Sequence, residues 1–207
     1  MQPFPALRSG GAIAWLRTLL AKGPRALQRA HLHYQPVAGR APRLHIIALD
    51  TSGSMRRGGR LASAKGHAAR LIEQAVVSGD DVALLSFGGA GVELLLLPGP
   101  ARRSGSACVR PLGGGGGTPL AAALAEADRL LRRSQLRHRG QGTCETWLWL
   151  LTDGRSLEQP NAPGAAEHIV IIDFDAPAGA SGTGIGRCAA WAAHWGAEHR
   201  YASLPTT

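Results

Sequence analysis

The sequence predicts an α/β fold, a three-layer, doubly wound arrangement in which helices cover both faces of a mostly parallel sheet. From residue 44 onward, short apolar runs alternate with longer segments of helical periodicity. Such alternation is typical of parallel sheets with helical crossovers. The glycine-rich link over residues 88–91 joins two apolar runs directly, which predicts a hairpin and therefore one antiparallel strand.

The expected elements follow in a regular order. Each strand is a short apolar run suited to a buried position, and each helix repeats its apolar residues every three or four positions. Pro119 suits the first turn of its helix, because its fixed φ is already helical there. Strands are expected over 44–49, 82–87, 92–97, 146–151, 168–172 and 199–202, and helices over 60–77, 119–133 and 186–195.

The first 43 residues differ from the rest of the chain. They hold seven of the 23 Arg and Lys residues and no Asp or Glu, so they account for +7 of the net charge of +9. Two short helices are expected here, over 11–22 and 24–32, followed by a linker over 35–42. We therefore divide the chain into a basic, helical N-terminal extension (1–43) and an α/β domain (44–207).

The partner of the basic extension stays open from composition alone. An acidic protein, nucleic acid or a membrane surface would each suit its charge, and so would simple solvation. Nucleic acid is the weakest of these alternatives, because only Trp15 and Tyr34 could stack on bases.

Composition also indicates where the protein works. No apolar stretch is long enough to form a transmembrane segment, and the run 12–20 is short and interrupted by Arg17. The three cysteines lie far apart, without the spacing of metal ligands, which suits a reducing compartment. We expect a cytoplasmic protein with inert thiols.

Oxygen-bearing side chains follow two of the expected strands and precede one helix. Asp50, Ser52 and Ser54 come directly after the first strand, Thr118 ends a glycine run before a helix, and Asp153 follows the 146–151 strand. Ligands bind beyond the carboxyl ends of strands in open α/β sheets. Carboxylate and hydroxyl oxygens without thiol or imidazole suit a hard cation. The sequence thus predicts a Mg²⁺ site, with Mn²⁺ and Ca²⁺ as alternatives.

This donor set predicts docking more than catalysis. Two carboxylates and three neutral hydroxyls would leave the cation weakly compensated, so that it would attract a carboxylate from another molecule. No His or Glu beside these loops is an obvious general base. We expect no catalytic activity of the chain's own.

Three segments, DTSGSM (50–55), GTPL (117–120) and LTDGR (151–155), resemble the metal-ion-dependent adhesion site (MIDAS) of von Willebrand factor A domains. The resemblance covers about residues 44–203 and implies a Rossmann-like fold. It also implies that Asp50, Ser52 and Ser54 are direct ligands, with Thr118 direct or through water and Asp153 mostly through water.

The segments between these motifs, among them DDVALLSFGG and GGGGGTPLAAAL, resemble the C-terminal domain of D subunits of magnesium chelatase and of related cobalt chelatase (cobaltochelatase) subunits. That resemblance implies an adaptor between an AAA+ ATPase subunit and the large subunit that inserts the metal into a tetrapyrrole, as in tetrapyrrole or cobalamin biosynthesis. The ATPase-like domain of D subunits has no counterpart here, so we expect a stand-alone module. The alternative is a general interaction module that serves another AAA+ ATPase or complex.

Other features have simpler interpretations. The glycine run over 113–117 lacks the Gly-Lys-Ser/Thr of a phosphate-binding loop. The G-x-G-x-G of residues 182–186 does not have dinucleotide-binding spacing and is expected to be a loop and a helix start. Asp173 and Asp175 follow the 168–172 strand at the same sheet edge. We interpret them as a solvated loop, with a role in shaping the site as the alternative.

Overall fold

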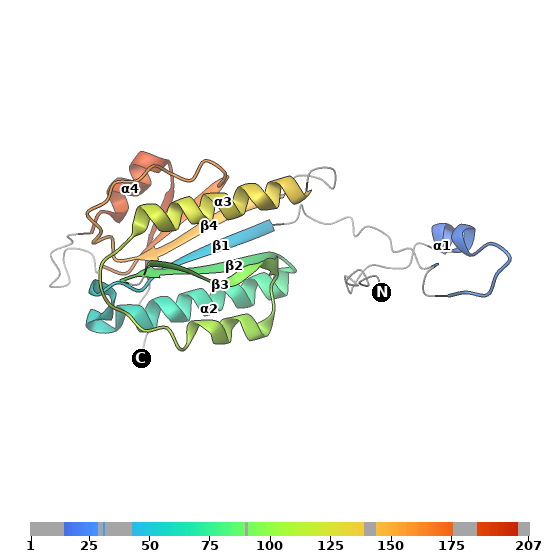
Figure 1. Cartoon of the computed structure of the whole chain (residues 1–207), viewed down its shortest axis with the longest axis horizontal. Helices are drawn as coiled ribbons and strands as arrows, with labels where there is room; N and C mark the ends of the chain where they lie inside the picture. Colours follow the sequence, from blue (N-terminus) through green and yellow to red (C-terminus); the bar gives the residue numbers. More distant parts are fainter. Residues whose placement is uncertain are drawn as a thin grey trace. The chain divides into compact units, whose positions relative to one another are not determined.

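A six-stranded sheet with the strand order β3-β2-β1-β4-β5-β6 forms the centre of the fold (Figure 1). All neighbouring strands are parallel except β2 and β3, which are antiparallel. The predicted α/β class, the hairpin and its antiparallel strand are therefore confirmed. The strands are β1 (Arg43–Asp50), β2 (Asp81–Gly88), β3 (Gly91–Pro100), β4 (Glu145–Thr152), β5 (His168–Asp173) and β6 (Glu198–Tyr201).

This computed structural model describes residues 15–28, 31, 43–89, 91–138, 144–175 and 186–202. The chain divides into two units, Met1–Arg40 and Ala41–Thr207. None of the described helices is long and apolar enough to cross a membrane. The three cysteines are free, and Cys144 and Cys188 are buried.

Helices cover both faces of the sheet (Figure 1). α2 (Arg60–Ser78) packs on one face, and α3 (Leu120–His138) and α4 (Cys188–Trp195) pack on the other. Two 3₁₀ helices, η2 (Ser54–Gly59) and η3 (Arg103–Val109), complete the described elements of this unit. α3 runs five residues beyond its expected end, because Ser134 is still buried against the domain.

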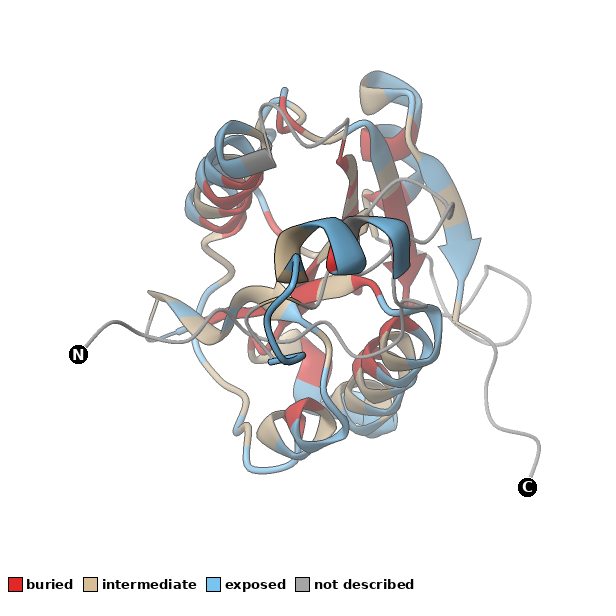
Figure 2. Ribbon diagram, turned by 90° about the vertical axis from the view of Figure 1, so that its right-hand side faces the viewer, coloured by how far each residue is buried: buried red, intermediate tan, exposed pale blue. Residues whose placement is uncertain are grey.

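Two apolar clusters hold these layers together. One lies between the sheet and α3 with α4, and its members include Ile46, Leu148 and Ile171. The other lies under α2, and its members include Ile47 and Ile72. The buried positions coloured in Figure 2 follow the sheet and the inner sides of its helices. The adjacent strands β1 and β4 are thus fixed on both faces by burial of apolar side chains.

The N-terminal unit contains α1 (Trp15–Lys22), which falls within the expected helix over 11–22. The second expected helix, over 24–32, is wrong for the residues described, since 24–28 form turns and irregular backbone. Gly23 ends α1 with a φ of +54°, and the His31 ring accepts a hydrogen bond from the Gln28 amide. So short a helix is marginal in water without packing. Residues 11–14 and the linker over 35–42 lie outside the described residues, as do 182–185 of the G-x-G-x-G segment.

Candidate metal centre

The candidate metal centre lies where the chain changes its direction of travel across the sheet. The chain passes outward from β1 to β2 and β3, then returns to β4 on the other side of β1. Parallel pairing aligns Leu49 of β1 with Leu151 of β4, so Asp50 and Thr152 end neighbouring strands at one edge. Ligand sites of open α/β sheets form at such a reversal of strand order.

Asp50 is fully buried at this edge, and both of its carboxylate oxygens accept hydrogen bonds. The Ser52 amide donates to Oδ1 at 2.8 Å, and the Thr152 hydroxyl donates to Oδ2 at 2.6 Å. Burial raises the pKa of Asp50, and the hydrogen bonds from Ser52 and Thr152 offset part of that effect. No ion pair within the described ranges involves Asp50. A cation at this place would favour its ionised form.

Side-chain oxygens connect the loop that follows β1, here called the first loop (residues 51–54), to the loop that follows β4 (residues 153–156). The Ser52 and Ser54 hydroxyl oxygens lie 3.2 Å apart, and the Ser54 hydroxyl donates to Asp153 Oδ1 at 3.0 Å. Adjacent oxygens of an octahedral Mg²⁺ shell, each about 2.1 Å from the ion, lie about 3.0 Å from one another. Ser52, Ser54 and Asp153 therefore already have the spacing that neighbouring ligands of Mg²⁺ require.

Thr118 reaches the same place from the glycine run. The Gly53 amide donates to the Gly116 carbonyl at 3.0 Å, which joins this run to the first loop. The Ser156 hydroxyl donates to the Thr118 carbonyl at 3.3 Å. These contacts border a hollow of about 420 Å³, here called the metal hollow, lined by Ser52, Ser54, Gly116, Gly117, Thr118, Arg155, Ser156, Leu157 and Glu158. The structure thus brings Thr118 to the serine ligand candidates.

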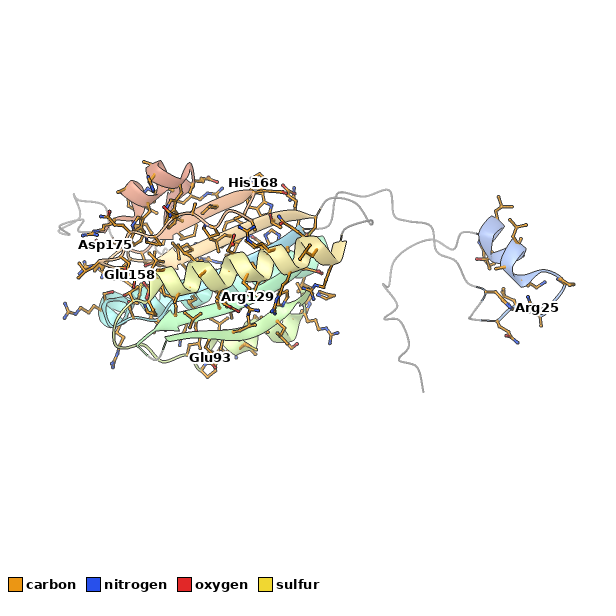
Figure 3. All side chains as sticks on the ribbon, turned by 45° about the horizontal axis from the view of Figure 1, so that its top comes forward. Arg25, Glu93, Arg129, Glu158, His168 and Asp175 are labelled. Atoms are coloured by element: carbon orange, nitrogen blue, oxygen red, sulfur yellow. The ribbon has the colours of Figure 1, made fainter. Side chains whose placement is uncertain are left out.

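The donor chemistry fits a hard cation. Among the described residues, no three His, Cys, Asp or Glu side chains gather as a metal cluster, so a cation here would depend on the hydroxyls. Two carboxylates and three hydroxyls form such an oxygen set. Glu158 and Asp175 lie toward this end of the domain, as Figure 3 shows.

Two arginines at the site were missed by sequence reasoning. Arg60 binds Asp153 Oδ2 at 3.2 Å and Asp175 Oδ1 at 2.8 Å. Arg155 donates to the same Asp175 oxygen at 3.0 Å, and its Nε lies 3.7 Å from Asp153 Oδ2. Part of the negative charge of Asp153 is therefore already neutralised by the arginines, so Asp153 would compensate a bound cation even less than the sequence alone suggests. Asp50 is the carboxylate without such compensation.

The solvated-loop interpretation of Asp173 and Asp175 is wrong. Each is only 6% exposed. Asp173 Oδ1 accepts a hydrogen bond from the Asp175 amide at 2.8 Å, and its Oδ2 lies 3.1 Å from His199 Nε2. Asp175 accepts hydrogen bonds from both Arg60 and Arg155. The alternative interpretation, that these two aspartates shape the site, is therefore the correct one. Their place at the end of β5, next to β4, was the signal for it in the sequence.

Close backbone packing fixes the loops around the site. The Gly115 amide donates to the Thr51 carbonyl at 2.8 Å, and the Gly89 amide donates to the Gly115 carbonyl at 2.7 Å. A Cβ on Gly116 would lie 2.3 Å from Gly89 Cα, and the φ of Gly116 is +70°. Only glycine fits there. The hairpin turn, the glycine run and the first loop thus form one connected rim.

Comparisons with known proteins show the family to which this fold belongs. Residues 45–155 match the model of the von Willebrand factor type A domain. The chain is 33% identical over 153 residues to the magnesium-chelatase 60 kDa subunit of Rhodobacter capsulatus, covering 74% of this chain and 25% of that protein. It is 42% identical over 113 residues to the subunit of the same name from Cereibacter sphaeroides, covering 55% of this chain and 19% of that protein.

One solved structure supports the fold alone. The crystal structure of the SpRpn10 VWA domain superposes with a TM-score of 0.54 at 14% identity, covering 80% of this chain and 91% of that one. The chain spans about a quarter of the length of the curated chelatase relatives that it matches.

Proposed function

The chain belongs to the von Willebrand factor type A domain family, and from this premise we propose that it is a non-catalytic adaptor subunit of a metal chelatase. Its relatives among magnesium-chelatase subunits support a chelatase-associated role. In this proposal an AAA+ ATPase subunit drives the reaction, and a large subunit inserts magnesium or cobalt into a tetrapyrrole. The adaptor joins the two in the cytoplasm.

The adaptor acts through a MIDAS-type site at the edge of the sheet. Asp50, Ser52, Ser54, Thr118 and Asp153 would hold the cation, which is Mg²⁺ in this proposal, with Mn²⁺ or Ca²⁺ as substitutes. When bound, the ion supplies a positive centre that accepts a carboxylate of the partner protein. Thr152 and the Ser52 amide orient Asp50 for this purpose. Arg60 and Arg155 hold Asp153.

One observation carries the proposal. Asp50 is fully buried and outside every ion pair of the described residues, and it lies directly beneath hydroxyls that line an open hollow. A buried carboxylate is costly unless it is paired or binds a metal. The hollow leaves room above the hydroxyls for a ligand from outside. Arg155 and Glu158 both line it, and Arg155 is paired with Asp153 and Asp175, so the attraction for an acidic group would come from the bound cation.

The test compares partner binding with and without the ion. The purified chain is immobilised and exposed to the purified ATPase and large subunits of a chelatase, in Mg²⁺ and in EDTA. Binding is expected only in Mg²⁺, and Ser54→Ala should remove it. Ser106→Ala is the matched control, because the Ser106 hydroxyl donates locally to the Arg103 carbonyl of η3, away from the metal hollow. Equal binding of the chelatase subunits in Mg²⁺ and in EDTA would refute the proposal that the chain binds its partners through a metal ion.

A general interaction module for another AAA+ ATPase or complex is the second candidate. The observation that favours it is that the family model matching residues 45–155 describes von Willebrand factor type A domains in general, not chelatase subunits in particular. Reconstituted metal insertion into a tetrapyrrole separates the two candidates. Activity that depends on this chain supports the chelatase adaptor, whereas metal-dependent binding to an ATPase without any effect on metal insertion supports the general module.

A further inference from the structure

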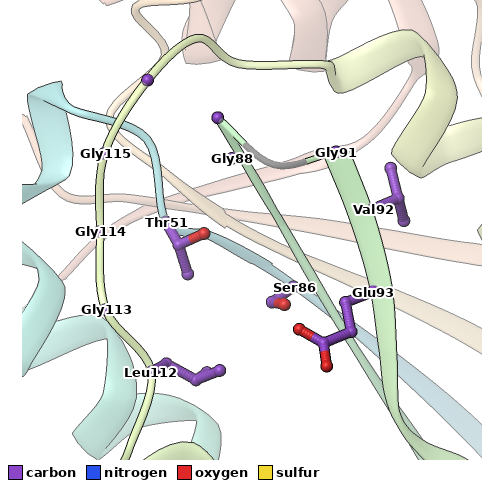
Figure 4. Close-up of a pocket in the computed structure, with 12 residues that line it drawn as sticks. Thr51, Ser86, Gly88, Gly91, Val92, Glu93, Leu112, Gly113, Gly114 and Gly115 are labelled. Atoms are coloured by element: carbon purple, nitrogen blue, oxygen red, sulfur yellow. The ribbon is translucent and has the colours of Figure 1, made fainter.

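A second and larger hollow borders the metal hollow. It has a volume of about 870 Å³ and lies between the β2–β3 hairpin and the glycine run (Figure 4). We call it the glycine hollow. Gly116 lines both hollows, so the two meet at this residue. A protein that places a carboxylate in the metal hollow therefore has the glycine hollow directly beside that contact.

Packing does not explain all of the glycines in its wall. Gly114 is required, because a Cβ there would lie 2.9 Å from Arg56 Cγ, and Gly116 is required by its φ and by Gly89. Gly113 and Gly115 have no positive φ, and a Cβ on either would meet nothing within 4 Å. Glycine costs more backbone entropy on folding than alanine does. These two glycines keep the hollow open at the expense of stability.

Three polar side chains are among the residues that line the hollow, and one of them, Thr51, already donates its hydroxyl to the Phe87 carbonyl. Glu93 from β3 is the one charged residue among its lining residues, and Figure 4 shows its carboxylate directed toward the space before the glycine run. Ser86 of β2 is only 6% exposed, and its hydroxyl makes no hydrogen bond within the described part of the chain. A buried polar group of this kind normally has a partner. The Ser86 hydroxyl borders the hollow, where water or a bound ligand can supply that partner.

We propose that the glycine hollow binds a lysine or arginine side chain of the partner whose carboxylate reaches the metal hollow. The inference rests on the proposed function, because one partner fills both hollows. Its alkyl stem would lie along Leu112 and Val92, and its cationic end would pair with Glu93 and donate to Ser86. The partner is thus recognised by an acidic and a basic side chain that lie close together.

The experiment uses ¹⁵N-labelled full-length chain and NMR. The probes are capped peptides that carry one aspartate and one lysine separated by zero to four glycines, titrated in Mg²⁺. A second set carries norleucine in place of lysine. At least one lysine peptide is expected to shift the amide signals of Ser86, Glu93 and Gly115 as well as Ser52 and Ser54. Its affinity is expected to be about fivefold higher than that of its norleucine counterpart.

Variants of the lining residues test whether the glycine hollow causes the preference for lysine over norleucine. Glu93→Gln should abolish the preference for lysine by removing the charge, and Gly115→Ala should reduce it by adding a methyl group to the wall of the hollow. Gly66→Ala is the matched control, since a Cβ on this exposed α2 glycine also meets nothing within 4 Å. Both alanine variants should fold at least as well as the parent chain, and Gly66→Ala should keep the preference.

The outcomes separate the two proposals. One outcome is that the lysine peptides still shift the signals of Ser86, Glu93 and Gly115 in the Ser54→Ala variant or in EDTA, and that Mg²⁺ changes no signal. This outcome would support cation binding in the glycine hollow and refute the metal-dependent function. Shifts confined to Ser52 and Ser54, or no difference between lysine and norleucine in any peptide, would overturn the glycine hollow. A preference for lysine that survives Glu93→Gln would overturn it as well.

Discussion

The Thr152 hydroxyl lies 2.6 Å from Asp50 Oδ2 and joins the ends of the two central strands at the candidate metal centre. The same hydroxyl accepts a hydrogen bond from the Gly154 amide at 3.1 Å. A residue that is not itself a ligand candidate therefore orients one carboxylate and shapes the loop of the other. Thr152 thereby links the two carboxylates of the site.

Thr152→Val is expected to weaken both the fold and the binding of the ion. The change keeps the shape of the side chain but removes the donor to Asp50, at a cost of about 1–3 kcal/mol. For a domain of this size we expect a fall in melting temperature of about 2–4 °C for each kcal/mol. Mg²⁺ affinity measured by calorimetry should fall as well. Thr152→Ser keeps the hydroxyl and should restore both properties, and failure of this rescue would exclude the hydrogen bond as the cause.

Asp50→Asn is expected to stabilise the chain in EDTA at neutral pH, by about 2–4 °C. Burial raises the pKa of Asp50, so the ionised carboxylate disfavours the folded state. The folded chain binds this proton more tightly than the unfolded chain does. Stability from Asp50 therefore increases as the pH falls through its raised pKa, and it is complete below the ordinary value of 3.8.

Thermal melts from neutral to acidic pH check this prediction. The advantage of the Asp50→Asn variant over the parent chain should shrink as the pH falls, and Mg²⁺ should stabilise only the parent chain. A variant that melts below the parent chain at neutral pH in EDTA would contradict it.

Arg155→Gln is expected to change ion binding and partner binding in opposite directions. Removing a positive charge near the cation should raise Mg²⁺ affinity about twofold to tenfold, because the repulsion between like charges is lost. Partner binding should weaken, because Arg155 lines the metal hollow where the partner carboxylate would arrive and also holds Asp153 and Asp175 in place there. Calorimetry with Mg²⁺ and a binding assay with the chelatase subunits measure the two effects. Arg129→Gln, a change at an exposed pair with Glu126 on α3, should alter neither.

Gly116→Ala is expected to disrupt the site through the backbone. The new Cβ would lie 2.3 Å from Gly89 Cα, and alanine would have to adopt a φ of +70°. We expect a loss of about 3 kcal/mol or more in the free energy of unfolding, measured by denaturant titration, together with loss of the response to Mg²⁺. A stability close to that of the parent chain would show that the hairpin turn and the glycine run do not pack as described.

The sequence predicted the parts of the site that follow from strand order. Asp50 and Asp153 each stand directly after a buried strand, and parallel pairing of β1 with β4 brings them to one edge. Thr118 was found because a hydroxyl ends the glycine run. Whether these residues hold a cation stays a prediction. The fold class needed only the alternation of strands and helices and the glycine link of the hairpin.

What the sequence missed depends on contacts between distant side chains. Arg60 begins α2 and looks like a solvated helix end, yet it lies 2.8 Å from Asp175, which is 115 positions away. No local pattern encodes that pairing. The failed helix over 24–32 has a different cause. A short helical pattern needs a surface to pack on, and residues 24–28 form a turn and irregular backbone instead.

The separation of the paired residues has a consequence for synthesis of the protein. Thr152 and Asp50 are 102 positions apart, and Ser54 and Asp153 are 99 apart. A nascent chain that has released β1 and α2 from the ribosome carries the serines but neither Asp153 nor the hydroxyl that orients Asp50. Domains generally fold as units during synthesis. The candidate ligand set is therefore complete only after translation has passed β4, and β1 reaches its final hydrogen-bonded edge at the same stage.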